Sequence, residues 1–175
     1  MDVDAIEAKK ISCFVPEYLT VEEHLRFAGR IYSLADIQTR IPPLLKKFDL
    51  QDKANALPST LSRGMKQKVA ICMGFLHDPL AIFLDEPLTG LDPIGIRNMK
   101  DAIVSRARQQ KAAVIVSSHQ LDLIEEICDD IFILDKGKCV ARGTIEQLRN
   151  QLGVSSGEMS LEALFFKLIE KQSQV

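Results

Sequence analysis

Two short apolar runs constrain the fold of this chain more than any other feature. LAIFL (80–84) and AVIVS (113–117) are apolar almost throughout, and a segment of helical period lies between them. Such runs are typical of parallel strands that are covered on both faces, and parallel neighbours need a crossover, usually a helix. The sequence therefore predicts an α/β fold with a largely parallel sheet.

Further strands and helices follow the same alternation. Strands are expected at 11–15, 131–135 and 138–142, and the last two flank Lys136-Gly137, a tight turn that predicts a hairpin at a sheet edge. Capping residues and prolines mark the helix starts. Thr20 with Glu23 and Thr144 with Gln147 form capping-box patterns. The expected helices are 21–32, 42–48 from Pro42 and Pro43, 65–76 after Ser62, 94–110 after Pro93, 146–152 and 161–171.

Composition limits the class of protein. The 175 residues carry a formal net charge of −2, without the basic footprint of a nucleic-acid-binding protein. No run approaches the roughly 18 apolar residues that span a bilayer. The cysteines lack metal-ligand spacing and lie mostly in apolar runs, which predicts buried thiols in the reducing cytoplasm. These are Cys13, Cys72, Cys128 and Cys139.

Two adjacent acids follow the strand at 80–84. Asp85 and Glu86 stand at its carboxyl end, where open parallel sheets bind their ligands. One acid in this place can hold Mg²⁺ directly or through water, and the other can orient or deprotonate a water for attack on a γ-phosphoryl group. Adjacent side chains of a strand point to opposite faces, so the two acids are expected to take different roles. For the acid pair alone, a plain turn with a solvated glutamate remains an alternative.

Three further elements favour phosphate chemistry. LSRGMKQKV (61–69) places a serine and a glycine at a helix N-terminus, where backbone N–H groups favour an anion. TGLDP (89–93) forms a turn into the next helix. His119 follows the strand at 113–117, where it can donate a hydrogen bond to a phosphate oxygen. Taken singly, an ordinary capped helix at 61–69 and a structural histidine remain alternatives.

In this order the elements resemble the signature motif, Walker B, D-loop and H-loop of ABC-transporter ATPase domains. FVPEYLTVEEHLRFAGRIY (14–32) resembles the Q-loop region, and residues 129–149 resemble the closing hairpin and helix of that family. The likeness is greatest to ABC-2 or multidrug-type exporters. It implies a P-loop NTPase-like parallel sheet core with an ABC α-helical subdomain. The partial ATPase domain would span 1–152, with the helical subdomain at 18–78 and the catalytic core at 79–143, before a hinge and amphipathic helix at 153–175.

The resemblance also implies roles for individual residues. Asp85 would serve Mg²⁺, Glu86 would be the general base and His119 would contact the γ-phosphate. The signature Ser62, Arg63, Gly64 and Met65 would close on ATP bound by another subunit, and Asp92 would communicate across that dimer. Arg63 and Met65 depart from the family's LSGGQ. The Q-loop is shortened, so Glu17 either replaces its glutamine or comes from beyond the deletion.

The implied function is that of the ATP-binding subunit of an ABC transporter. It would couple ATP binding and hydrolysis, in a head-to-tail homodimer or heterodimer, to transport by a separate transmembrane permease subunit. The protein would be cytoplasmic and peripheral at the inner face of the cell membrane.

One family motif is missing, because no GxxxxGK[ST] occurs in the sequence. Met1 therefore resembles an internal methionine of a longer, N-terminally truncated domain. The chain alone is expected neither to bind ATP tightly nor to hydrolyse it, and its sheet is expected to leave apolar faces uncovered. An alternative is a non-catalytic interaction module that offers its signature to a complete partner ATPase. A role in DNA repair or translation is disfavoured by the acidic net charge.

Overall fold

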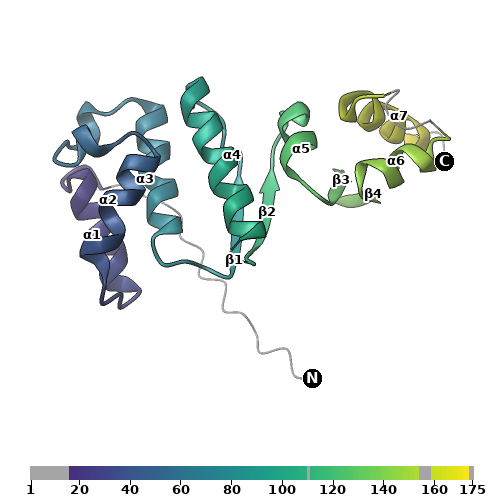
Figure 1. Ribbon diagram of the computed structural model, residues 1–175. Coiled ribbons are helices and arrows are strands. Elements are labelled where there is room, and N and C mark those ends of the chain that lie inside the picture. The colour runs from purple at the N-terminus through teal and green to yellow at the C-terminus, as the bar shows by residue number, and fades with distance from the viewer. Residues whose placement is uncertain (1–15, 110, 154–158, 174–175) are drawn as a thin grey trace, which may run out of the picture. The chain divides into compact units, whose positions relative to one another are not determined.

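The computed structural model describes residues 16–109, 111–153 and 159–173. These residues form two compact units that meet in sequence between Ser117 and Ser118, and each unit is described by itself (Figure 1). The strand expected at 11–15, Cys13 and most of the expected hinge at 153–160 lie outside the described residues.

Three helices open the first unit: α1 (Val21–Ile31), α2 (Ile37–Lys47) and α3 (Arg63–Phe75). Two 3₁₀ turns, η1 (Gln51–Lys53) and η2 (Pro58–Thr60), connect α2 to α3. The capping box of Thr20 and Glu23 and the Ser62 cap form as predicted. Val69, Met73 and Leu76 are buried together, as the spacing predicted.

The start predicted for α2 is wrong. The helix begins at Ile37, so Pro42 and Pro43 lie in its interior and not in its first turn. Proline has no N–H, so two backbone hydrogen bonds of α2 cannot form. The extra first turn is supported by an ion pair between Asp36 and Arg40, one helical turn apart. Burial of Ile41 and Leu45 anchors the helix.

The first unit continues into a parallel pair of strands. β1 (Ala81–Asp85) and β2 (Ala113–Ser117) pair in parallel, as predicted, and α4 (Pro93–Arg108) makes the crossover. α4 contacts β2 and buries Met99 against the core. Phe83 and Ile115 are 67% and 59% exposed, so the two-sided cover expected from the apolar runs is absent among the described residues. The uncovered apolar face was expected for a sheet without its first strands.

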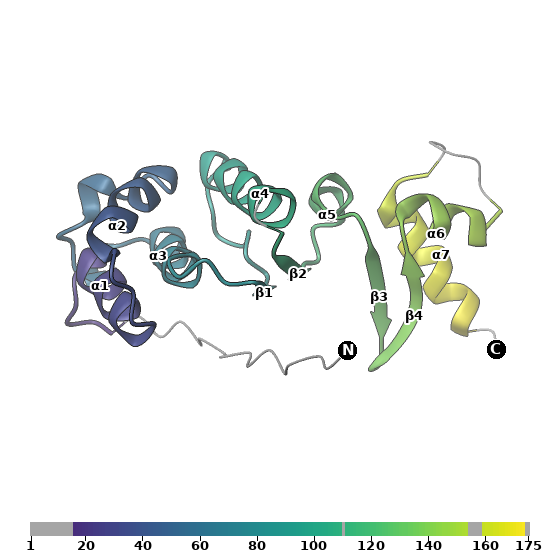
Figure 2. The same ribbon diagram turned by 60° about the horizontal axis from the view of Figure 1, so that its bottom comes forward.

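The second unit is an antiparallel hairpin with helices on one face. β3 (Ile131–Asp135) pairs with β4 (Lys138–Gly143) through Lys136 and Gly137, whose φ angles are +47° and +77°. Figure 2 shows α6 (Ile145–Gln151) and α7 (Leu161–Ser173) beside this hairpin. The predicted hairpin is confirmed, and the described strands form two two-stranded sheets, one in each unit. α5 (Leu121–Ile127) was not predicted.

The thiols are less uniformly buried than the sequence suggested. Cys72 is fully buried, and burial raises the pKa of its thiol. Cys128 is half-buried, whereas Cys139 is exposed, as is Leu134 opposite it in the β3–β4 register. The prediction of a buried thiol is therefore wrong for Cys139. Among the helices that the structure describes, none has the length and apolar character needed to cross a membrane.

Candidate functional site: an acid pair and a helix–loop junction

The first part of the site is the carboxyl end of the parallel strand pair. Asp85 is the last residue of β1 and stands opposite Ser117 of β2 in the register. The Ser117 hydroxyl donates to Asp85 Oδ1, and the Ser117 carbonyl oxygen accepts from the Glu86 N–H at 3.0 Å. Ser117, which the sequence did not single out, thus holds both acids at the sheet edge where ligands of α/β proteins bind.

Glu86 is directed by a turn and not by the strand pleat. β1 ends at Asp85, and Glu86 has a φ of +46°, in the left-handed region that non-glycine residues rarely adopt. Glu86 therefore lies outside the strand, and the predicted strand alternation does not set the direction of its side chain. The Thr89 hydroxyl donates to Glu86 Oε2 at 3.3 Å. Backbone strain of this kind is concentrated at functional sites.

The acid end fits Mg²⁺ only as part of a larger ligand set. Asp85 is exposed, and the Ser117 hydroxyl engages one of its two carboxylate oxygens. Within 16–109, 111–153 and 159–173 there is no cluster of three or more His, Cys, Asp or Glu side chains that could hold a metal ion. Mg²⁺ is usually held by one or two carboxylates together with substrate phosphates and water, so Asp85 suits this arrangement.

The second part of the site is the α3–loop junction, formed by Gly64 and Lys68 of α3 with Gly90 and Asp92 of the loop 86–92. A Cβ on Gly64 would collide with the carbonyl oxygen of Gly90. Gly90 itself has a φ of +79°. The close approach of two backbones therefore requires glycine at position 64. Ser62 caps the helix beside this contact by accepting the Met65 N–H at 3.2 Å.

An ion pair closes the other side of the α3–loop junction. Lys68 Nζ lies 3.2 Å from Asp92 Oδ1, and the Lys68 side chain is only 7% exposed. The same Asp92 oxygen accepts the Gly95 N–H at 3.1 Å and caps α4. The Lys68 ammonium, followed by the Gly95 N–H, lowers the pKa of Asp92. Asp92 thus connects the start of α4 to α3.

The loop 86–92 joins the two parts of the site. Glu86 contacts Thr89 at its beginning, Gly90 meets Gly64 in its middle, and Asp92 pairs with Lys68 at its end. Leu88 is 2% exposed and anchors the loop in the core. The acid pair and the N-terminus of α3 are therefore held by one short segment.

The remaining predicted residues are placed as follows. Arg63 is exposed beside Gly90, and Met65 is half-buried in the first turn of α3. Glu17 is exposed, with its carboxylate 3.5 Å from Lys66 Nζ of α3, so the predicted Q-loop residue meets the helix of the signature motif. His119 is exposed two residues beyond β2, in the second unit. Its role beside Glu86 stays a prediction.

Comparisons with known proteins decide the family. Residues 4–89 match the family described as "ABC transporter". The chain is 36% identical over 159 residues to the ABC-type transporter ATP-binding protein EcsA of Bacillus subtilis strain 168, covering 90% of this chain and 63% of EcsA. It is 30% identical over 165 residues to the uncharacterized ABC transporter ATP-binding protein YthP of the same organism, covering 90% and 69%. The chain belongs to the ABC transporter ATP-binding family. The predicted family is confirmed.

Solved structures agree on the fold. A structure described as the ATP-binding subunit of an ABC transporter matches with a TM-score of 0.80 at 38% identity, over 89% of this chain and 65% of that one. A dimeric ATP-binding cassette with ADP and Pi matches with a TM-score of 0.68 at 22% identity, which shows the fold alone. The predicted P-loop NTPase-like α/β class is confirmed. The chain spans less than two thirds of EcsA and of the first of these solved chains.

Proposed function

We propose that this chain supplies the Walker B, signature, D-loop and H-loop elements of an ABC-transporter ATP-binding subunit. That subunit couples ATP binding and hydrolysis, in a head-to-tail homodimer or heterodimer, to transport by a transmembrane permease. It works in the cytoplasm at the inner face of the membrane. The observation that carries the proposal is the loop 86–92, which joins two acids at a sheet edge to the N-terminus of α3.

Glu86 is proposed as the general base for hydrolysis. Its carboxylate orients a water and accepts a proton as the water oxygen bonds to the γ-phosphorus and ADP leaves. The Thr89 hydroxyl steadies Glu86 Oε2 for this task. Asp85, oriented by Ser117, would hold Mg²⁺, which when bound neutralises charge on the phosphoryl oxygens. His119 would donate a hydrogen bond to the γ-phosphate.

The N-terminus of α3 is proposed to face ATP on a second chain. Backbone N–H groups after the Ser62 cap, including those of Gly64 and Met65, can donate to phosphate oxygens, and the helix dipole favours the negative charge. Asp92, at the end of the loop 86–92, would communicate across that dimer. Glu17 would face the permease. Without a GxxxxGK[ST] sequence, the 175 residues alone are expected neither to bind ATP tightly nor to hydrolyse it.

A chimera tests the proposed catalytic roles. The segment of EcsA that aligns with this chain is replaced by the aligned residues of this chain, so that EcsA contributes the remainder. Mg²⁺-dependent ATP hydrolysis is expected, with a loss of at least about a hundredfold for Glu86→Gln and retained ATP binding. Asp101→Asn, an exposed acid on α4, is the matched control and should leave turnover unchanged. Undiminished turnover in Glu86→Gln would contradict the proposed base.

The alternative is a non-catalytic module that lends its signature to a complete partner. The assembled α3–loop junction, in a sequence without GxxxxGK[ST], favours it specifically. The whole chain would then stimulate hydrolysis by a complete family member, and Ser62→Ala would reduce the stimulation while Glu86→Gln would not. Sensitivity to Glu86→Gln in this mixture would favour the catalytic role.

A further inference from the structure

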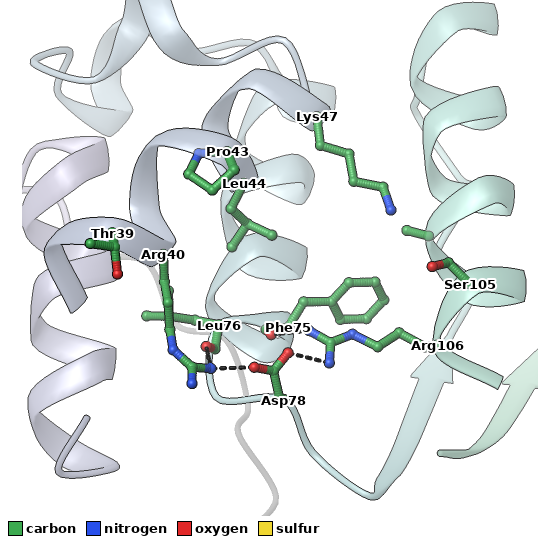
Figure 3. Close-up of a pocket in the computed structure, with 11 residues that line it drawn as sticks. Thr39, Arg40, Pro43, Leu44, Lys47, Phe75, Leu76, Asp78, Ser105 and Arg106 are labelled. Carbon is green, nitrogen blue, oxygen red and sulfur yellow. Dashed lines mark hydrogen bonds and ion pairs between the residues drawn. The ribbon is translucent and has the colours of Figure 1, made fainter. Parts of the chain in front are cut away.

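A cavity of about 320 Å³ lies at the opposite end of α3 and α4 from the α3–loop junction. It is lined by α2, by the end of α3 with the following Asp78, and by the last turns of α4 (Figure 3). Along α4, Arg106 stands 14 residues beyond Asp92, which corresponds to roughly 20 Å at 1.5 Å per residue. The cavity is therefore separate from the proposed nucleotide site.

The cavity carries an excess of positive charge. Arg40, Lys47 and Arg106 line it against a single acid, Asp78. Figure 3 shows the Asp78 carboxylate between the two guanidinium groups, and both arginines pair with it. Asp78 is thus already shared and has little capacity for a further cation.

Further contacts fix both arginines in place. Arg40 also pairs with Asp36 and donates to the Leu76 carbonyl oxygen at 3.1 Å. Arg106 donates to the Phe75 carbonyl oxygen at 2.5 Å, and its guanidinium carbon lies 5.4 Å from the centre of the Phe75 ring. The two guanidinium groups therefore form a rigid positive wall with most of their donors in use.

Lys47 differs from the arginines. Its side chain extends from α2 toward α4, and it makes no hydrogen bond or ion pair with any residue that the structure describes (Figure 3). Burial of part of the side chain, and then the positive charge of Arg106, lowers the pKa of Lys47, while Asp101 opposes this effect. The Ser105 hydroxyl in the same cavity donates to Gln109 Oε1 at 3.0 Å, so its proton is already engaged.

We propose that this cavity binds a small organic phosphate, whose phosphate group pairs with Lys47 and whose apolar part packs against Leu44 and Phe75. The volume is at the lower end of the range for small-molecule sites, which begins at about 300 Å³. A doubly charged phosphate suits this position because the positive charges of both Lys47 and Arg106 attract it. Leu44 and Phe75 provide the apolar wall that favours an organic ligand over the free ion.

The test is a titration of the ¹⁵N-labelled 175-residue chain with phenyl phosphate, followed by NMR. Saturable shifts are expected for backbone amides of residues 39–41, 44–47 and 102–106. Inorganic phosphate and phenol, which each keep one half of the probe, should bind more weakly by about tenfold or more. Lys47→Gln should weaken binding of phenyl phosphate by about tenfold, because it removes the charge that pairs with the phosphate.

Lys46→Gln is the matched control, since Lys46 is the preceding exposed lysine of α2 and does not line the cavity. It should leave the affinity unchanged. The backbone spectra of both variants show whether the fold is kept. Absence of saturable shifts at these amides, or equal weakening by the two substitutions, would overturn the proposal. No nucleotide turnover enters the readout, so this result is independent of the proposed ATPase function.

Discussion

The two ends of the loop 86–92 differ in how far the chain itself completes them. At the α3–loop junction, Gly64 is packed against a backbone carbonyl and Lys68 is buried against Asp92. At the acid end, Asp85 is exposed and accepts a hydrogen bond from the Ser117 hydroxyl. The junction is a packed structural contact, whereas Asp85 lies exposed at the end of its strand. Substitutions at the junction should therefore cost folding free energy, and substitutions of the acids should not.

The largest effect is expected from Gly64→Ala. The new methyl group would collide with the Gly90 carbonyl oxygen, which belongs to the backbone and cannot rotate away. The free energy of unfolding should fall by about 1–3 kcal/mol, as for other overpacked sites. Urea denaturation followed by circular dichroism measures this change.

Gly74→Ala is the control for Gly64→Ala, because Gly74 lies in the same helix and a Cβ there would meet no atom within 4 Å. It should raise the free energy of unfolding by about 0.5–1 kcal/mol through helix propensity. If Gly64→Ala were as well tolerated as Gly74→Ala, the close approach of the two backbones would be refuted.

The smallest effect is expected at the acid end. Asp85→Asn and Glu86→Gln keep the side-chain shapes, and both positions are at least partly exposed, so each should change the free energy of unfolding by no more than about 0.5 kcal/mol. Urea denaturation followed by circular dichroism measures this change as well. A loss comparable to that of Gly64→Ala would show that the acids are part of the structural core, and would abolish the contrast between the two ends.

Local signals predicted much of the fold. The caps at Thr20, Ser62 and Thr144 act within one helical turn, so their residue types alone reveal them. α5 has no such signal, because its N-cap, Gln120, makes no side-chain capping bond. The start of α2 was missed because the proline pair suggested a first turn, while the helix tolerates both prolines in its interior.

The site was predicted less completely, because part of it depends on contacts between residues that are far apart in the sequence. Asp85 and Glu86 follow an apolar run, so position in the sequence is enough to find them. Ser117 and Lys68 act through partners more than twenty residues away, as the strand register and the ion pair show. A lysine between apolar residues of a helix gives no sign of its partner. Only the packing of α3 against the loop 86–92 shows that Asp92 is the partner of Lys68.

The most direct test of the assembled junction is the pKa of the Asp92 carboxyl group, followed by ¹³C NMR in the wild-type chain and in Lys68→Met. In the wild type we expect a pKa below the ordinary value of about 3.9. Because the folded-state pKa is lowered, the ion pair stabilises the fold above that ordinary value, and the contribution fades as the pH falls through the folded-state pKa. Lys68→Met should return the pKa toward 3.9 and weaken this acid dependence of stability. An identical Asp92 pKa in both proteins would show that α3 and the loop 86–92 are not joined as described.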